Sequence, residues 1–144
     1  GSGPTPRSTC PISCALELMG DRWTLVVMRD LVLGGRRRFS ELAHHEGIAT
    51  NILADRLERL ERWKLLEKTR DPDDGRRRIY VPTDKGRALV PVLLELAIWG
   101  ADHAGGTAHP ELVARARQDR DSLIAELGTV PDSQGQPSSS GSSS

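Results

Sequence analysis

The sequence predicts a mainly α-helical protein with one small antiparallel β-hairpin. Apolar residues recur every three or four positions through most of its 144 residues, which is the spacing of a helix face. Two short strand-like runs, residues 66–70 and 77–82, lie on either side of an Asp- and Gly-rich turn. Only five residues are aromatic, so the core is expected to consist mainly of Leu, Val, Ile and Ala.

Two helices are expected before residue 35. Pro11 suits the first turn of a helix, and an apolar stripe at helical spacing continues that helix to Gly20. A second helix follows, capped by either Asp21 or Thr24 and ended by Gly34. Its sequence leaves little polar surface, so we expect it to be mostly buried.

Residues 39–81 are expected to form one connected module of helix, turn, helix and hairpin. A short helix begins at Phe39, Gly47 provides the turn, and a longer helix follows. The core-facing residues of that longer helix are predicted to be Leu53, Leu57 and Leu60. This order is the layout of a winged helix-turn-helix, in which the second helix enters the major groove of DNA and the hairpin is the wing.

Further helices are expected after the hairpin. One starts at Thr83 and ends at Gly100, with Pro91 inside it as the source of a kink. A last amphipathic helix is predicted from about residue 110 to residue 127. The predicted fold is therefore a winged helix-turn-helix with additional helices at both ends.

The two ends of the chain differ in composition from the rest. We expect a flexible lead at residues 1–9, one domain at residues 10–127, and a disordered Pro/Ser/Gly-rich tail at residues 128–144. No apolar run approaches the roughly 18 residues of a membrane span, and no charged-then-apolar leader precedes the domain. A cytoplasmic location is therefore expected. Two cysteines are too few for a disulfide framework.

The formal net charge is zero, but the charge is unevenly distributed. Residues 36–87 contain fourteen basic and ten acidic side chains, whereas residues 88–144 contain three basic and seven acidic ones. The positive charge thus coincides with the predicted helix-turn-helix and wing, as expected of a surface that faces phosphates. The scarcity of aromatic residues argues against a surface on which RNA bases stack.

Short polar and cationic side chains of the second module helix are expected to contact bases. Thr50 and Asn51 can hydrogen-bond to base edges, and Arg56 and Arg59 can reach guanine or phosphate. The alternative for Arg56 is pairing within the helix near Glu58 or packing on the side of Ile52. The alternative for Arg59 is pairing with Asp55, four residues earlier.

A second group of side chains is expected at the phosphates. Because neighbouring strand residues alternate sides, two of the three hairpin arginines are predicted to meet DNA and the third to pair with Asp73 or Asp74. One or two of the three arginines before the short helix are likewise predicted to contact phosphate, beside the hydroxyl of Ser40 and the helix N-terminus, which is itself an anion site. The members of this group are Arg36, Arg37, Arg38, Ser40, Arg76, Arg77 and Arg78.

The chain resembles the HxlR family of bacterial winged-helix transcriptional regulators. The matching segments are CPISCALELMGDRWTLVVMRDLVLGGRRRFSEL, GIATNILADRLERLERWKLLEK, and DPDDGRRRIYVPTDKGRALVPVL with a later WG, within residues 10–100. Many members have Ser where this chain has Ala49, so the cap of the reading helix is expected to shift to Thr50.

The resemblance implies a homodimer that binds an inverted-repeat operator. The dimer interface would be formed by the first helix and the helices after the wing, at Ile12, Leu16, Leu93, Leu96 and Trp99. Leucine-rich helices on both sides of so small a module also favour dimerisation on physical grounds. The two reading helices would then lie roughly 34 Å apart, one turn of DNA.

Regulation through a thiol or a small molecule is a further expectation. Cys10 matches the cysteine that family members commonly have at the start of their first helix, where in some members it senses oxidants or electrophiles. The alternative is a small residue packed at the dimer seam. An apolar effector pocket is predicted with Trp23 and Trp99 as walls.

No cofactor or metal is expected, because Cys10, Cys14, His44 and His45 lack a recognised ligand spacing. An enzyme is also not expected, since no nucleophile–base set, carboxylate pair or phosphate loop is present. The leading hypothesis is a dimeric DNA-binding transcriptional regulator. The alternative is a winged-helix protein-interaction module that does not bind DNA.

Overall fold

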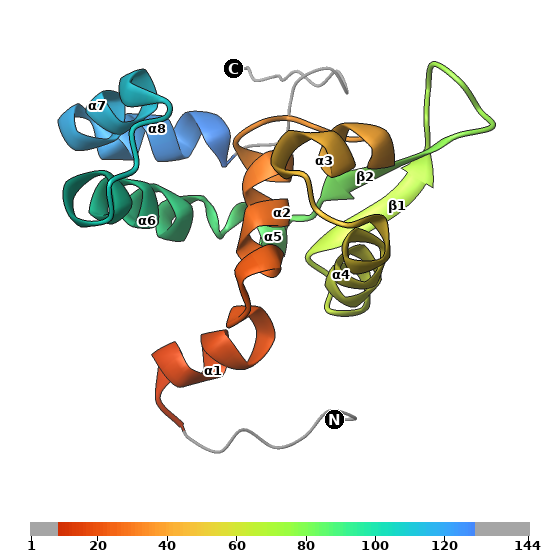
Figure 1. The fold of residues 1–144 in the computed structure, drawn as a ribbon, viewed down its shortest axis with the longest axis horizontal. Helices are drawn as coiled ribbons and strands as arrows, with labels where there is room; N and C mark the ends of the chain where they lie inside the picture. The colour runs from red at the N-terminus through yellow and green to blue at the C-terminus, as the bar shows by residue number, and fades with distance from the viewer. Residues whose placement is uncertain (1–8, 129–144) are drawn as a thin grey trace, which may run out of the picture. The chain divides into compact units, whose positions relative to one another are not determined.

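The structure, a computed structural model, describes residues 9–128 as two compact units divided between Leu89 and Val90 (Figure 1). Apart from Thr9 and Gly128, the predicted lead at 1–9 and the predicted tail at 128–144 lie outside the described residues. The mainly helical fold with one small antiparallel sheet is confirmed.

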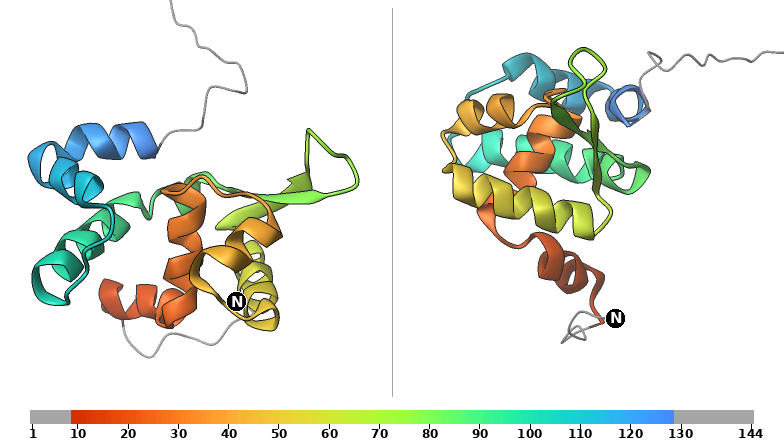
Figure 2. Two further views of the ribbon diagram at one scale, coloured as in Figure 1. Left: turned by 45° about the horizontal axis from the view of Figure 1, so that its top comes forward. Right: turned by 90° about the vertical axis from the view of Figure 1, so that its right-hand side faces the viewer.

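The first unit contains the winged helix-turn-helix. Its two-stranded ribbon projects beyond the helices of this unit in both further views (Figure 2). In chain order its elements are α1 (Pro11–Met19), α2 (Arg22–Val32), α3 (Phe39–Glu46), α4 (Thr50–Arg62), β1 (Leu66–Arg70), β2 (Arg78–Pro82) and α5 (Asp84–Arg87).

Helix α2 is the centre of this unit, as its apolar sequence predicts. It contacts α1, α4, α5 and β2. Its buried residues are Thr24, Val27, Met28, Asp30, Leu31 and Val32. The cap of α2 is Asp21, whose Oδ2 accepts from the N–H of Trp23 at 3.1 Å, so the choice between Asp21 and Thr24 is resolved.

The turn between α3 and α4 and the start of α4 are set by two residues. Gly47 ends α3 in the left-handed region (φ 69°), a conformation that glycine adopts without steric cost. The cap of α4 is Ala49, with Thr50 as the first helical residue, so the expected shift of the cap to Thr50 is wrong. Alanine has no side-chain acceptor, so no side chain caps α4. The extended backbone of Ala49 directly precedes the first helical residue.

The wing pairs Leu66 with Pro82 at its base and Arg70 with Arg78 at its outer end. Strand β2 begins one residue later than predicted, at Arg78. The N–H of Tyr80 donates to the carbonyl of Arg37 at 2.8 Å, which attaches the segment between α2 and α3 to the sheet.

The second unit consists of α6 (Val90–His103), α7 (Pro110–Gln118) and α8 (Arg120–Leu127). Both helices predicted after the wing are divided in the structure. The first is split at Ala88 and Leu89, so Pro91 lies in the first turn of α6, where its missing N–H is not needed, and causes no kink. Helix α6 also continues past Gly100.

The predicted helix at 110–127 is interrupted by Asp119, which leaves the helical region (φ −148°, ψ 72°). Its carboxylate accepts from the N–H of Ser122 at 3.3 Å and so caps α8. The packing of α7 and α8 on α6 buries Leu94, Ala116 and Leu123. Within residues 9–128, no helix combines the length and the apolar character needed to cross a membrane.

Candidate nucleic-acid interface

The rotation of α4 about its axis decides which side chains it presents outward. Leu53, Leu57 and Leu60 are buried, as predicted, and define the inner face. Successive residues of a helix are rotated by about 100° about its axis, which places another set of residues opposite these leucines. We call this opposite side the outer face of α4. The outer face consists of Asn51, Asp55, Glu58 and Arg62, all exposed.

Arg56 lies beside the outer face, toward α2, and its side chain is only 20% exposed. Its Nε donates to Asp21 Oδ2 at 2.8 Å and its Nη1 to Asp55 Oδ2 at 2.6 Å. These carboxylates raise the pKa of Arg56, with the hydrogen bond to Asp21 as the largest cause. A direct base contact by Arg56 stays a prediction, and it requires breaking these bonds.

Arg59 also lies at the edge of the outer face. Its guanidinium is 5.1 Å from the ring centre of Trp63, a cation–π contact, and its Nη1 is 3.7 Å from Asp55 Oδ2. The intrahelical pairing with Asp55 considered from the sequence is therefore present, and contact with DNA stays a prediction.

The arginines before α3 are mostly engaged within the protein. Arg38 Nε donates to the buried Asp71 at 2.9 Å, which joins this segment to the base of the wing turn. Arg37 is half-buried and donates to the carbonyls of Leu31 and Arg36. Burial lowers the pKa of Arg37. The predicted phosphate contacts of these arginines remain untested, and Arg37 is the least available of them.

The N-terminus of α3 holds a carboxylate of the protein itself. Glu41 accepts from the N–H groups of Arg37 at 2.9 Å and Arg38 at 3.0 Å, and these bonds lower the pKa of Glu41. Ser40 is exposed beside it in the first turn. The predicted anion site at this helix end is thus partly occupied by Glu41.

The wing arginines Arg76 and Arg77 are more exposed than the arginines before α3 and those beside the outer face of α4. Arg76 is 93% exposed at its side chain, 3.6 Å from Asp74, and Arg77 lies 3.4 Å from the same carboxylate. The predicted pairing with Asp74 is therefore made by two arginines, whereas Asp73 lies 3.8 Å from Arg38.

Arg78 is the third wing arginine and stands opposite Arg70 in the register of the two strands. Like charges placed directly opposite one another destabilise a strand pair. The Nη1 of Arg70 donates to the carbonyl of Gly75 at 2.7 Å, so its guanidinium is drawn toward the tip of the wing.

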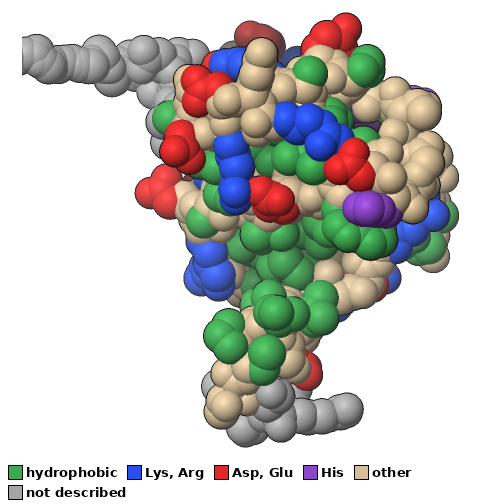
Figure 3. Space-filling view, turned by 90° about the vertical axis from the view of Figure 1, so that its left-hand side faces the viewer, with side chains coloured by type: hydrophobic (Ala, Val, Ile, Leu, Met, Phe, Trp, Pro, Cys, Tyr) green, Lys and Arg blue, Asp and Glu red, His purple; other side chains and the backbone are tan. Residues whose placement is uncertain are grey.

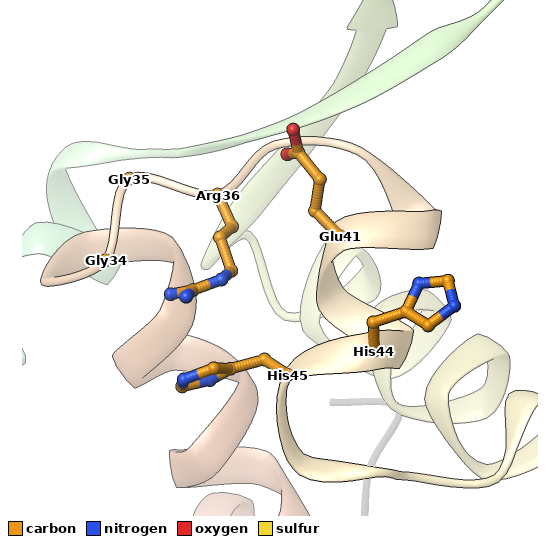
Figure 4. Close-up of a pocket in the computed structure, with 6 residues that line it drawn as sticks. All are labelled: Gly34, Gly35, Arg36, Glu41, His44 and His45. Atoms are coloured by element: carbon orange, nitrogen blue, oxygen red, sulfur yellow. The ribbon is translucent and has the colours of Figure 1, made fainter.

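An open pocket of about 590 Å³ lies between the α2–α3 loop and α3 (Figure 4). Figure 4 shows Arg36 and His45 pointing into the same space, whereas Glu41 and His44 point away. His45 Nδ1 is 2.9 Å from Oδ1 of the buried Asp30, and Arg36 Nη1 is 3.9 Å from that oxygen. Sequence reasoning missed this cluster, because its members come from separate elements without a motif.

Four of the five predicted dimer residues, Ile12, Leu16, Leu96 and Trp99, are exposed. Leu93 is only 6% exposed and belongs to the core of the second unit, so it is unavailable for contact between copies. Val92, which sequence reasoning omitted, is exposed on α6. Figure 3 shows hydrophobic side chains gathered on α1, the lower projection in that view.

The predicted effector and sensor residues lie as follows. Cys10 is exposed at the start of α1, and Cys14 is partly exposed one turn later. Trp23 has the guanidinium of Arg22 4.6 Å from its ring centre, and the Trp99 ring lies 5.1 Å from that of His103. A pocket between the tryptophans stays a prediction. Among residues 9–128, no three His, Cys, Asp or Glu side chains are grouped as metal ligands.

Comparison with known proteins places this arrangement among bacterial regulators. A family model described as HxlR-like helix-turn-helix matches residues 18–107. The HTH-type transcriptional regulator YodB of Bacillus subtilis is 33% identical over 95 residues, which are 65% of this chain and 84% of that protein. The uncharacterized regulator MT3179 of Mycobacterium tuberculosis is 35% identical over 101 residues, 70% of this chain. The match spans 63% of the length of that mycobacterial relative.

Solved structures agree with the fold. The reduced form of YodB from B. subtilis superimposes with a TM-score of 0.55 and 30% identity, covering 69% of this chain and all of that one. The crystal structure of PA1607, a candidate transcription factor, gives a TM-score of 0.63 and 36% identity over 67% of each chain.

The ion pair between Asp21 and Arg56 predicts a pH-dependent stability. Burial raises the pKa of Asp21, but hydrogen bonds from Thr24 and Arg56 outweigh it and lower the pKa from 3.8 to about 2. A depressed pKa contributes stability above pH 4 that is lost as the pH falls toward 2. Asp21→Asn keeps the cap and removes the charge, so we expect a loss of about 1 kcal/mol at pH 7, since solvent weakens a pair exposed to this degree.

Urea denaturation of wild type and Asp21→Asn at pH 7, 4 and 3 measures this difference, which should shrink at the lowest pH. Asp73→Asn is the control, because that carboxylate is highly exposed and 3.8 Å from its partner. A difference that stays constant down to pH 3 would show that the Asp21 carboxylate is not its source.

Proposed function

Because the chain belongs to the HxlR-like helix-turn-helix family, we propose that it is a sequence-specific DNA-binding transcriptional regulator. It acts as a homodimer on an inverted-repeat operator, in the bacterial cytoplasm where the DNA lies. The observation that supports this most is the joining of a helix with a polar outer face and an arginine-rich wing in one compact unit. A helix and a wing held this way can contact the major groove and the backbone of one duplex.

The wing provides the cations for the phosphates in this proposal. Arg76 and Arg77 make only long, exposed contacts with Asp74, which are weak enough to be exchanged for phosphate. Arg78 on the wing and Arg62 on α4 make no ion pair within residues 9–128. These four arginines replace the group before α3 as the main candidates for phosphate contact.

The exposed apolar side chains support the homodimer. Ile12 and Leu16 on α1, and Val92, Leu96 and Trp99 on α6, are large hydrophobic residues left in water by a single chain. Burying such residues against a second copy is favourable, by about 25 cal/mol for each Å² of apolar surface. Exposed hydrophobic side chains that cluster on one surface are typical of interaction sites, and Ile12 and Leu16 share α1, as Val92, Leu96 and Trp99 share α6.

Thiol modification is the proposed route of regulation. YodB, the B. subtilis relative, has been solved in reduced, quinone-bound and diamide-treated forms. In this chain Cys10 is exposed and starts the helix that presents Ile12 and Leu16, so a group added to its sulfur would alter the proposed dimer contact. Binding of a small-molecule effector is the alternative form of control.

DNA binding should depend steeply on salt. With an operator selected from a randomised duplex library, the logarithm of affinity should fall against the logarithm of salt concentration with a slope near −0.9 for each phosphate contacted. Arg77→Ala should weaken binding to operator and random DNA about equally and reduce the slope by about 1. Arg120→Ala, which removes an exposed arginine of α8, is the control. Absence of binding to every sequence at low salt would favour the protein-interaction module instead.

Dimerisation should be lost when a charge is placed on the apolar surface of α6. Leu96→Glu would bury a carboxylate against the partner, so we expect dimer affinity to fall by at least about a hundredfold. Sedimentation velocity over a concentration series measures the change. Ala114→Glu adds the same charge at an exposed position of α7 and should leave the dimer intact. A monomeric wild type would contradict the proposal directly.

The role of Cys10 can be tested with an oxidant and an electrophile. Diamide or a quinone should weaken operator binding by wild type and leave Cys10→Ser unaffected, as measured by fluorescence anisotropy. Cys14→Ser is the matched control on the same helix and should respond like wild type. If both variants respond like wild type, the effect of the reagent does not pass through Cys10.

A further inference from the structure

The outer face of α4 presents a carboxylate where contact with bases is expected. Asn51 and Asp55 lie on this face in the first two turns, and the side chain of Asp55 is 54% exposed. An acidic group turned toward DNA is repelled by phosphates unless a neighbouring cation offsets its charge. The surroundings of Asp55 supply that cation.

Two arginines contact the same oxygen of Asp55. Arg56 Nη1 lies 2.6 Å from Oδ2, and Arg59 Nη1 lies 3.7 Å from it. Both ion pairs are formed at Oδ2, so Oδ1 is the oxygen that we assign to a donor outside the protein. The negative charge of Asp55 is thus offset by arginines at Oδ2, and Oδ1 is the oxygen proposed to accept from DNA.

Arg56 is itself held from the opposite side. Its Nε donates to Asp21 Oδ2 at 2.8 Å, and Asp21 is fixed in turn by the N–H of Trp23 at 3.1 Å and the hydroxyl of Thr24 at 2.5 Å. A continuous chain of hydrogen bonds therefore runs from the N-terminus of α2, through Arg56, to Asp55 on the outer face of α4.

We propose that Asp55 is the specificity-determining residue for a C·G base pair in each half-site, and that Asp21 and Arg56 are positioning residues that act through it. This inference rests on the proposed DNA binding. An ionised carboxylate only accepts hydrogen bonds, and the N4 amino group of cytosine is a donor in the major groove. The major-groove edges of guanine and thymine present acceptors and no donor, so they repel a carboxylate. The amino donor of adenine lies between its own N7 acceptor and the O4 acceptor of thymine, so adenine binds the carboxylate less well than cytosine does.

The test is selection of binding sites from a randomised duplex library, followed by affinity measurements on matched operators. Wild type should enrich cytosine at one position of each half-site. Asp55→Asn should reduce the preference for C·G over A·T at that position about five- to tenfold. Glu58→Gln is the matched control, because it removes one negative charge from the same face. This control should raise affinity for all sequences equally without changing the preference.

The positioning residues are tested at the same base pair. Asp21→Asn keeps the cap of α2 but loses the ion pair, and it should relax the preference at that position and at no other. Combined with Asp55→Asn it should cause no further relaxation, because both act on one contact. If Asp21→Asn acted only by destabilising the fold, it would instead weaken binding to every DNA sequence alike.

Two results would overturn the inference while leaving DNA binding intact. Asp55→Asn could keep the cytosine preference of wild type, or Asp55→Asn and Glu58→Gln could change the base preference to the same extent. A wild type that enriches no sequence from the library would instead refute the proposed function itself, so the two failures are distinguishable.

Discussion

The packing of Leu53, Leu57 and Leu60 into the first unit is the constraint on which the rest of the candidate interface depends. A helix that buries three leucines on one side can rotate little about its axis, because any rotation would expose them to water. Its outward residues are therefore decided by the core. Asn51 and Asp55 face outward as a result, and Arg56 is directed toward α2 and its capping residue.

Most of the fold could be predicted from the sequence, because helix faces and the hairpin turn leave periodic, local signals. The inner leucines of α4 and the wing strands were predicted for that reason, whereas the cap of α2 was narrowed only to Asp21 or Thr24. The partner of Arg56 could not be predicted, since Asp21 lies 35 residues away and ion pairs leave no periodic pattern. The break at Asp119 was missed because the apolar spacing continues through it.

In the candidate site, too, local patterns could be predicted from the sequence and long-range contacts could not. Clusters of arginine indicated a phosphate-facing region, but only the structure separates those that stabilise the protein from those that remain available. Arg37 and Arg38 fasten the segment before α3 to α2 and the wing. Fewer arginines are accordingly available to a ligand than the sequence contains in this region. Those that remain available lie on the wing and at the end of α4.

The facing arginines of the wing, Arg70 and Arg78, have a further consequence. Like charges at facing positions of a strand pair oppose the pairing, and mobile anions screen such repulsion. Raising the ionic strength therefore stiffens the free wing, whereas it weakens attraction to a polyanion. In the proposed complex, a backbone phosphate beside this end of the wing would offset the positive charge of both residues, so the wing would be more ordered on DNA than in the free protein.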